Sequence, residues 1–139
     1  MVQRTTAKEQ HRRLISALLP QKDLDEAGGR VAVENHLNMV LPTSARPAVP
    51  VEILAAFLAT DTADRVLRCI NASVAVSATE LEALPLPAPG DLVAAMASTN
   101  PESAVRRLYG INDADGEKRP TQASTRRVAK QLAFPSACR

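Results

Sequence analysis

The chain has 139 residues, of which 45% are hydrophobic, and it carries a formal net charge of +2 with one Tyr, two Phe and no Trp. This length fits one domain or two very small ones, and with so few aromatic residues a core must be built from Ala, Val, Leu and Ile. No apolar stretch approaches the roughly 20 residues that span a bilayer. We therefore expect no membrane contact and an intracellular location, or a virion if the protein is viral.

Residues 1–41 are predicted to form N-terminal helices. Thr6 and Glu9 have the spacing of a capping box, in which a hydroxyl and a carboxylate each satisfy a backbone N–H at the start of a helix. Gly28 and Gly29 favour a helix end, because glycine adopts positive φ without steric cost. The helices expected in this part span 7–19, 21–27 and 30–41.

A proline-rich linker over 42–50 precedes a helical core predicted over 51–111. Two helix-turn-helix-like hairpins form that core, with Asp61 and Asn100 as the expected caps of their second helices. Residues 71–77 fit either a short strand or a continuation of the preceding helix. The helices expected in the core span 52–59, 62–70, 78–84, 91–97 and 101–109. These patterns predict an all-α fold, a small helical bundle built from short helical hairpins with proline-rich connecting arms.

The two hairpins resemble each other in sequence. They align without gaps at a separation of 39 residues, which pairs Pro50 with Pro89 and Arg68 with Arg107. Repeats of this period are typical of stacked helical units. Any two Ala-rich helical hairpins also resemble each other, so the alignment is compatible with either a duplication or a chance likeness. Both interpretations predict the same local geometry of helix, capped turn and helix.

Charge is distributed unevenly along the chain. Residues 101–139 carry eight basic and four acidic groups, and no acidic residue follows Glu117. A tail of one sign is typically an interaction feature, and its cations suit the neutralisation of phosphates. We expect residues 112–139 to form a basic C-terminal tail with a short helix over 121–134.

The second hairpin also has the spacing of a DNA-reading helix-turn-helix module. Such modules place a small residue about ten positions before an inward-facing apolar residue, as Ala95 and Val105 are placed here. Arg106 and Arg107 would then lie near the outer face of the second helix, where arginine can pair with guanine. The turn at 98–100 lacks the glycine usual in these modules. The alternative is a packed helical hairpin with a solvated arginine pair.

No catalytic or metal-binding motif stands out. His11 and His36 are isolated, and no Cys or carboxylate lies at ligand spacing around either. Cys69 and Cys138 are expected to be two free thiols rather than a disulfide framework. We therefore predict a protein that is not an enzyme and that needs no cofactor and no metal.

The leading hypothesis is a non-enzymatic, self-assembling structural protein that contacts DNA or RNA, mainly through phosphates, as a viral or phage coat or nucleoprotein subunit does. One alternative is a small dimeric DNA-binding regulator that reads DNA with residues 91–109, and another is a protein–protein interaction scaffold. The leading hypothesis implies a homo-oligomer. Its expected nucleic-acid-binding residues are Arg12, Arg13, Arg106, Arg107, Lys118, Arg119, Arg126, Arg127 and Lys130.

Overall fold

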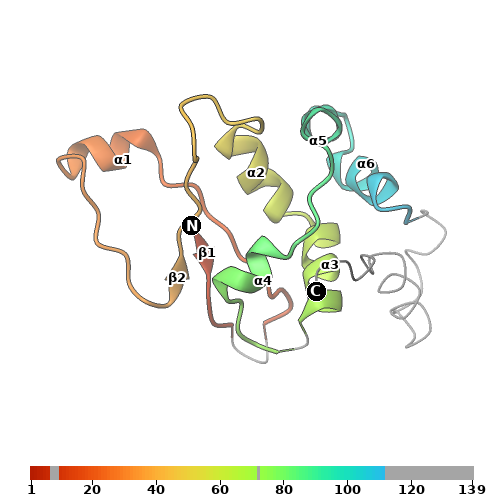
Figure 1. Ribbon diagram of the computed structural model, residues 1–139, viewed down its shortest axis with the longest axis horizontal. Helices are drawn as coiled ribbons and strands as arrows, with labels where there is room; N and C mark the ends of the chain where they lie inside the picture. Colours follow the sequence, from red (N-terminus) through yellow and green to blue (C-terminus); the bar gives the residue numbers. More distant parts are fainter. Residues whose placement is uncertain (7–9, 72, 112–139) are drawn as a thin grey trace, which may run out of the picture.

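The computed structural model describes residues 1–6, 10–71 and 73–111 (Figure 1). Within these ranges the chain forms six helices and one two-stranded sheet, which confirms the predicted helical fold class. The predicted helix over 121–134 lies outside the described residues. In chain order the elements are β1 (Val2–Gln3), α1 (Gln21–Glu26), β2 (Leu37–Asn38), α2 (Val51–Leu58), α3 (Asp61–Ile70), α4 (Ala78–Glu82), α5 (Pro89–Met96) and α6 (Pro101–Leu108).

The helix predicted over 7–19 is wrong, because residues 10–19 form no helix. The N-terminal segment is extended and uses its backbone groups in long-range pairs. Gln3 N–H donates to the carbonyl of Ile15 at 2.8 Å, and the carbonyl of Arg4 accepts from Val76 N–H at 2.7 Å. Leu14 and Leu18 have helical spacing in the sequence, yet they do not share an environment, since Leu14 is buried whereas Leu18 is 41% exposed.

The helix predicted over 30–41 is also wrong. This segment contains β2, which pairs antiparallel with β1 so that Val2 lies opposite Asn38, and Arg4 N–H donates to His36 O at 2.7 Å. The short helix predicted over 21–27 is confirmed as α1. Gly28 and Gly29 follow it with φ values of 69° and 75°, in the region that glycine adopts without strain.

Both predicted hairpins are present, α2 with α3 and α5 with α6. Their first helices pack against each other, and so do their second helices. The cap of α3 is Thr60 rather than the predicted Asp61, because the Thr60 hydroxyl accepts from Ala63 N–H at 3.1 Å. Asn100 caps α6 as predicted, with its side chain accepting from Ser103 N–H at 3.1 Å. The two capped turns therefore differ by one position in the 39-residue alignment.

The core lies between the two hairpins and the N-terminal segment. It is built mainly from Leu, Val and Ala, as expected, around the fully buried ring of Phe57. Residues 71 and 73–77 form neither a helix nor a regular strand, and Ala75 makes an isolated bridge to Thr5. The chain then enters α4 through a complete capping box between Ser77 and Glu80, which lowers the pKa of the Glu80 carboxyl because the Ser77 backbone N–H and hydroxyl both donate to it.

Candidate nucleic-acid interface

Arg12, one of the predicted phosphate contacts, binds the chain itself. Its guanidinium donates to the carbonyls of Ala59 at 2.5 Å and Thr60 at 2.7 Å, where α2 ends and its last carbonyls lack helical partners. It also lies 3.7 Å from the carboxylate of Asp61. Arg12 therefore stabilises the turn between α2 and α3, and only part of its charge faces solvent.

Arg13 belongs to a network around the buried carboxylate of Asp64 on α3. One oxygen of Asp64 accepts from the backbone N–H groups of Arg13 and Leu14, both at 2.6 Å. The other accepts from Arg68 Nε at 2.7 Å, and Arg68 also donates to the carbonyl of His11. Asp64 thus fixes the N-terminal segment to α3. Its carboxylate supplies the hydrogen-bond acceptor that backbone N–H groups of this irregular segment need when they are buried.

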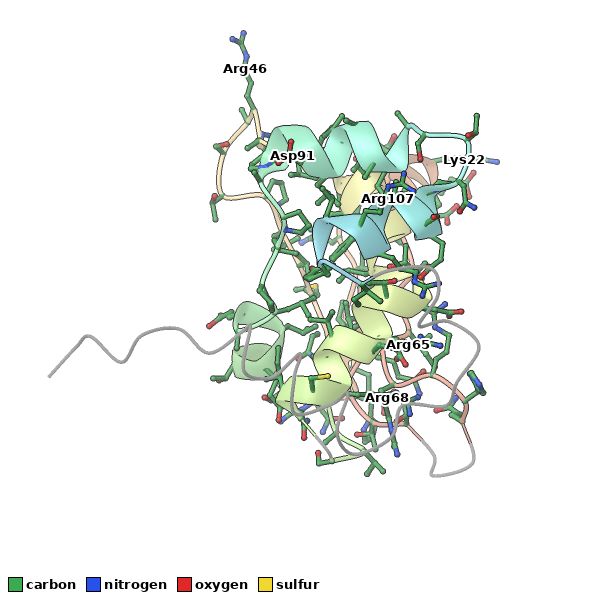
Figure 2. The ribbon with its side chains drawn as sticks, turned by 90° about the vertical axis from the view of Figure 1, so that its right-hand side faces the viewer. Lys22, Arg46, Arg65, Arg68, Asp91 and Arg107 are labelled. Carbon is green, nitrogen blue, oxygen red and sulfur yellow. The ribbon has the colours of Figure 1, made fainter. Side chains whose placement is uncertain are left out.

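Three arginines share one side of the molecule. Figure 2 shows Arg107 on α6 above Arg65 and Arg68 on α3, and all three are exposed. We call Arg65, Arg68 and Arg107 the arginine face. Arg107 donates to the Ser103 hydroxyl at 3.1 Å, whereas Arg65 and Arg107 form no ion pair with any of the described residues. Two full positive charges are therefore available on this side.

The predicted cations within the described residues lie in two places. Arg12 and Arg13 lie where the N-terminal segment meets α3, while Arg106 and Arg107 occupy the last turn of α6, where cations favour the negative end of the helix dipole. Arg106 is half-buried and Arg107 is exposed. The remaining predicted residues lie in the sequence beyond the described part of the chain: Lys118, Arg119, Arg126, Arg127 and Lys130.

Arg65 and Arg68 were not among the contacts predicted from the sequence. The signal for Arg68 was present, because the 39-residue alignment places it opposite Arg107. Arg65 had no such signal, since its counterpart in the second hairpin is Ala104. Only the packing of α3 against α6 brings it to the same side as Arg107.

The first turn of α6 is not free to enter a DNA groove. The carboxylate of Glu102 in this turn accepts from the backbone N–H groups of Asp61 at 2.9 Å and Thr62 at 3.0 Å. Ala104 and Val105 are buried against the core. Helix-turn-helix readers use the N-terminal residues of this helix for base contacts, so the packing argues against that role.

An open groove of about 310 Å³ runs beside Arg107 between α5 and α6. Small side chains line most of it, with Asp91 and Arg107 as its charged residues. The Ser98 hydroxyl donates to the carbonyl of Ala95 at 2.7 Å, as a residue at a helix end commonly does. The hydroxyl proton is therefore engaged in this hydrogen bond. None of the residues that line the groove is a base that activates the Ser98 hydroxyl as a nucleophile.

Across residues 1–6, 10–71 and 73–111, no group of three His, Cys, Asp or Glu side chains is placed to hold a metal ion, and no helix is both long and apolar enough to cross a membrane. Cys69 on α3 is a free thiol whose pKa is raised by burial, which lowers its reactivity at neutral pH. The predicted free thiol of Cys138 lies beyond residue 111.

Comparison of the chain with protein-family models, with curated proteins and with solved structures gave no match.

Proposed function

We propose that this protein is a non-enzymatic structural protein that self-assembles and binds nucleic acid through its phosphates, in the manner of a viral or phage coat or nucleoprotein subunit. The observation that supports it best is a pair of exposed arginines that form no ion pair with the described residues, followed in the sequence by a run rich in cations. Arg65 and Arg107 are exposed on one side, and α6 leads directly into a tail whose last 22 residues, 118–139, hold six cations and no acid.

Neutralising phosphates releases condensed counterions, and this term is independent of sequence. The arginine face and the tail are suited to that mode because arginine binds phosphate oxygens in a bidentate fashion. Among the described residues the aromatic side chains are engaged in the fold, since Tyr109 hydrogen-bonds to the Pro85 carbonyl at 2.6 Å and Phe57 is buried. The proposed ligand is therefore DNA or RNA of any sequence, and the proposed location is an assembled particle or an intracellular complex.

The experiment that tests this proposal is binding of the full-length chain to random-sequence DNA and RNA, followed by fluorescence anisotropy. A variant in which the six tail cations are replaced by Gln should lose most of its affinity at low salt, because the dominant electrostatic term is removed. Light scattering with and without nucleic acid tests assembly in parallel. A chain that stays a monomer or a plain dimer in both conditions rules out the coat-like role.

The second candidate, a dimeric regulator that reads DNA with residues 91–109, makes a different prediction. Replacing Arg106 and Arg107 together by Ala would relax a preference for one sequence over another if those residues read bases. In the phosphate-binding proposal the same change weakens binding to all sequences alike. If neither the tail nor the α6 variant alters retention of nucleic acid at low salt, only the interaction scaffold is left.

A further inference from the structure

Several exposed apolar side chains gather around the N-terminal segment. We call this group the apolar face. Leu18, Val40 and Val51 line one shallow cleft of about 20 Å³ whose floor includes Leu54 and Leu58. Its members and their exposed fractions are Leu18 (41%), Met39 (55%), Val40 (38%), Leu41 (69%) and Val51 (38%). Met39 and Leu41 flank Val40 in the sequence, and exposed apolar side chains grouped in this way mark an interaction site on a folded protein.

The backbone of the same region is open as well. β2 pairs with β1 along one edge only, and residues 39–41 continue beyond β2 without a backbone hydrogen bond to any other part of the described chain. Unpaired N–H and C=O groups on an edge form a template for another strand. Apolar side chains and an open edge therefore coincide in residues 37–41.

The charges around this edge favour a second copy of the same chain as the occupant. Residues 37–45 contain no charged residue, so two copies that run antiparallel place no like charges opposite each other. Glu34 precedes this stretch and Arg46 follows it. In an antiparallel pair each acidic end then approaches the partner's basic end, and a two-fold axis makes this contact twice. A nucleic acid has no cation to bind within 37–45.

We propose that a second copy of this chain covers the apolar face, with residues 37–41 of the two copies running antiparallel about a two-fold axis. This inference depends on the self-assembly in the proposed function and specifies the surface that joins two subunits; a coat-like particle needs further contacts between such dimers. β2 lies on the opposite side of the molecule from α6 (Figure 1), and the arginine face is seen from the α6 side (Figure 2). Assembly through the apolar face therefore leaves the arginine face accessible to nucleic acid.

The test is sedimentation velocity of the full-length chain over a wide concentration range. The wild-type protein should associate as concentration rises, whereas Met39→Gln/Leu41→Gln should stay a monomer at the same concentrations. The control, Ile70→Gln/Leu86→Gln, changes two apolar residues of 40% and 52% exposure elsewhere and should associate as the wild type does. Association of Met39→Gln/Leu41→Gln at the wild-type level overturns the proposed surface.

A charge swap tests the antiparallel arrangement independently of apolar packing. Glu34→Arg and Arg46→Glu should each raise the dimer dissociation constant by several-fold, and the double variant should restore it. Equal dissociation constants for all four proteins overturn the arrangement. Because Gln adds no charge, nucleic-acid binding by Met39→Gln/Leu41→Gln is a separate readout. If this variant no longer associates but still binds DNA, the inference is supported. If the wild-type protein associates but binds no DNA, only the nucleic-acid part of the proposed function is refuted.

Discussion

The carboxylate of Glu102 on α6 accepts a 2.5 Å hydrogen bond from the hydroxyl of Thr62 in the first turn of α3. The same carboxylate accepts the backbone N–H groups of Asp61 and Thr62, which have no partner within their own helix. A residue of the second hairpin thus caps a helix of the first. This contact, together with the packing of α3 against α6, fixes how the two hairpins meet.

Replacing Glu102 by Ala should lower the free energy of unfolding by about 2 kcal/mol, because hydrogen bonds to charged groups contribute about 1.5–3 kcal/mol and the N-terminus of α3 loses its anion. Urea unfolding followed by circular dichroism measures the change. Glu82→Ala on the exposed face of α4 is the control and should change stability by less than about 0.5 kcal/mol. Equal effects of the two substitutions would contradict the capping role.

The carboxylates of Asp64 and Asp61 come from residues three apart in the sequence, and that of Asp64 is buried whereas that of Asp61 is exposed. Asp64→Ala should lower the free energy of unfolding by about 3–5 kcal/mol. The substitution leaves the backbone N–H groups of Arg13 and Leu14 and the guanidinium of Arg68 without their acceptor. Asp61→Ala should lower the free energy of unfolding by less than about 1 kcal/mol, because the Asp61 side chain is 66% exposed beside Arg12. Thermal unfolding of both variants measures the difference.

The Asp64 contacts also predict which part of the chain loses protection first when the carboxylate is removed. Amide hydrogen exchange in Asp64→Ala should increase first at residues 11–17, whose position depends on this carboxylate. Protection in α5 and α6 should persist longer. Uniform loss of protection across the chain, or no loss at 11–17, would show that Asp64 does not hold the N-terminal segment.

The helical hairpins were predictable because their signals are local. Asn100 and the glycines after α1 act within one turn of chain, and the structure confirms the helix boundary that each indicated. The shift of the α3 cap from Asp61 to Thr60 is a difference of one residue between two good capping residues. Such a choice is decided by tertiary contacts, here the Glu102 carboxylate on the Asp61 N–H.

The N-terminal segment was not predictable from local pattern. Leu14 and Ile15 fit a helical stripe, but the backbone around them is paired with the chain start, and Asp64 lies about 50 residues away in sequence. Propensity is overridden where such long-range partners satisfy the backbone. The arginine face was not predicted from the sequence for the same reason, since Arg65 and Arg107 come together only through packing of α3 on α6.

Tyr109 offers a pH-dependent test of how α6 ends. Burial raises the pKa of its phenol to about 12, and the hydroxyl donates to the Pro85 carbonyl. The neutral form is favoured in the folded state, so its contribution to stability is complete below about pH 10, the ordinary tyrosine pKa, and is lost as pH rises to about 12. Tyr109 is the single Tyr and the chain has no Trp.

The ultraviolet absorbance of tyrosinate therefore reports Tyr109 alone. The titration midpoint of the folded protein should lie near 12, and the unfolded protein in urea should titrate near 10, the value for an exposed phenol. A folded-state midpoint near 10 would mean that the Tyr109 hydroxyl is in free contact with water.

The central claim, that the arginine face binds phosphates, is tested most directly by the salt dependence of binding to random-sequence duplex DNA. Removal of two phosphate contacts should make the slope of log affinity against log salt shallower by about 2 in Arg65→Ala/Arg107→Ala. Lys22→Ala/Arg30→Ala removes the same charge from exposed positions in and just after α1 and should leave the slope unchanged. The same slope in both variants, or wild-type binding that is insensitive to salt, would contradict the account.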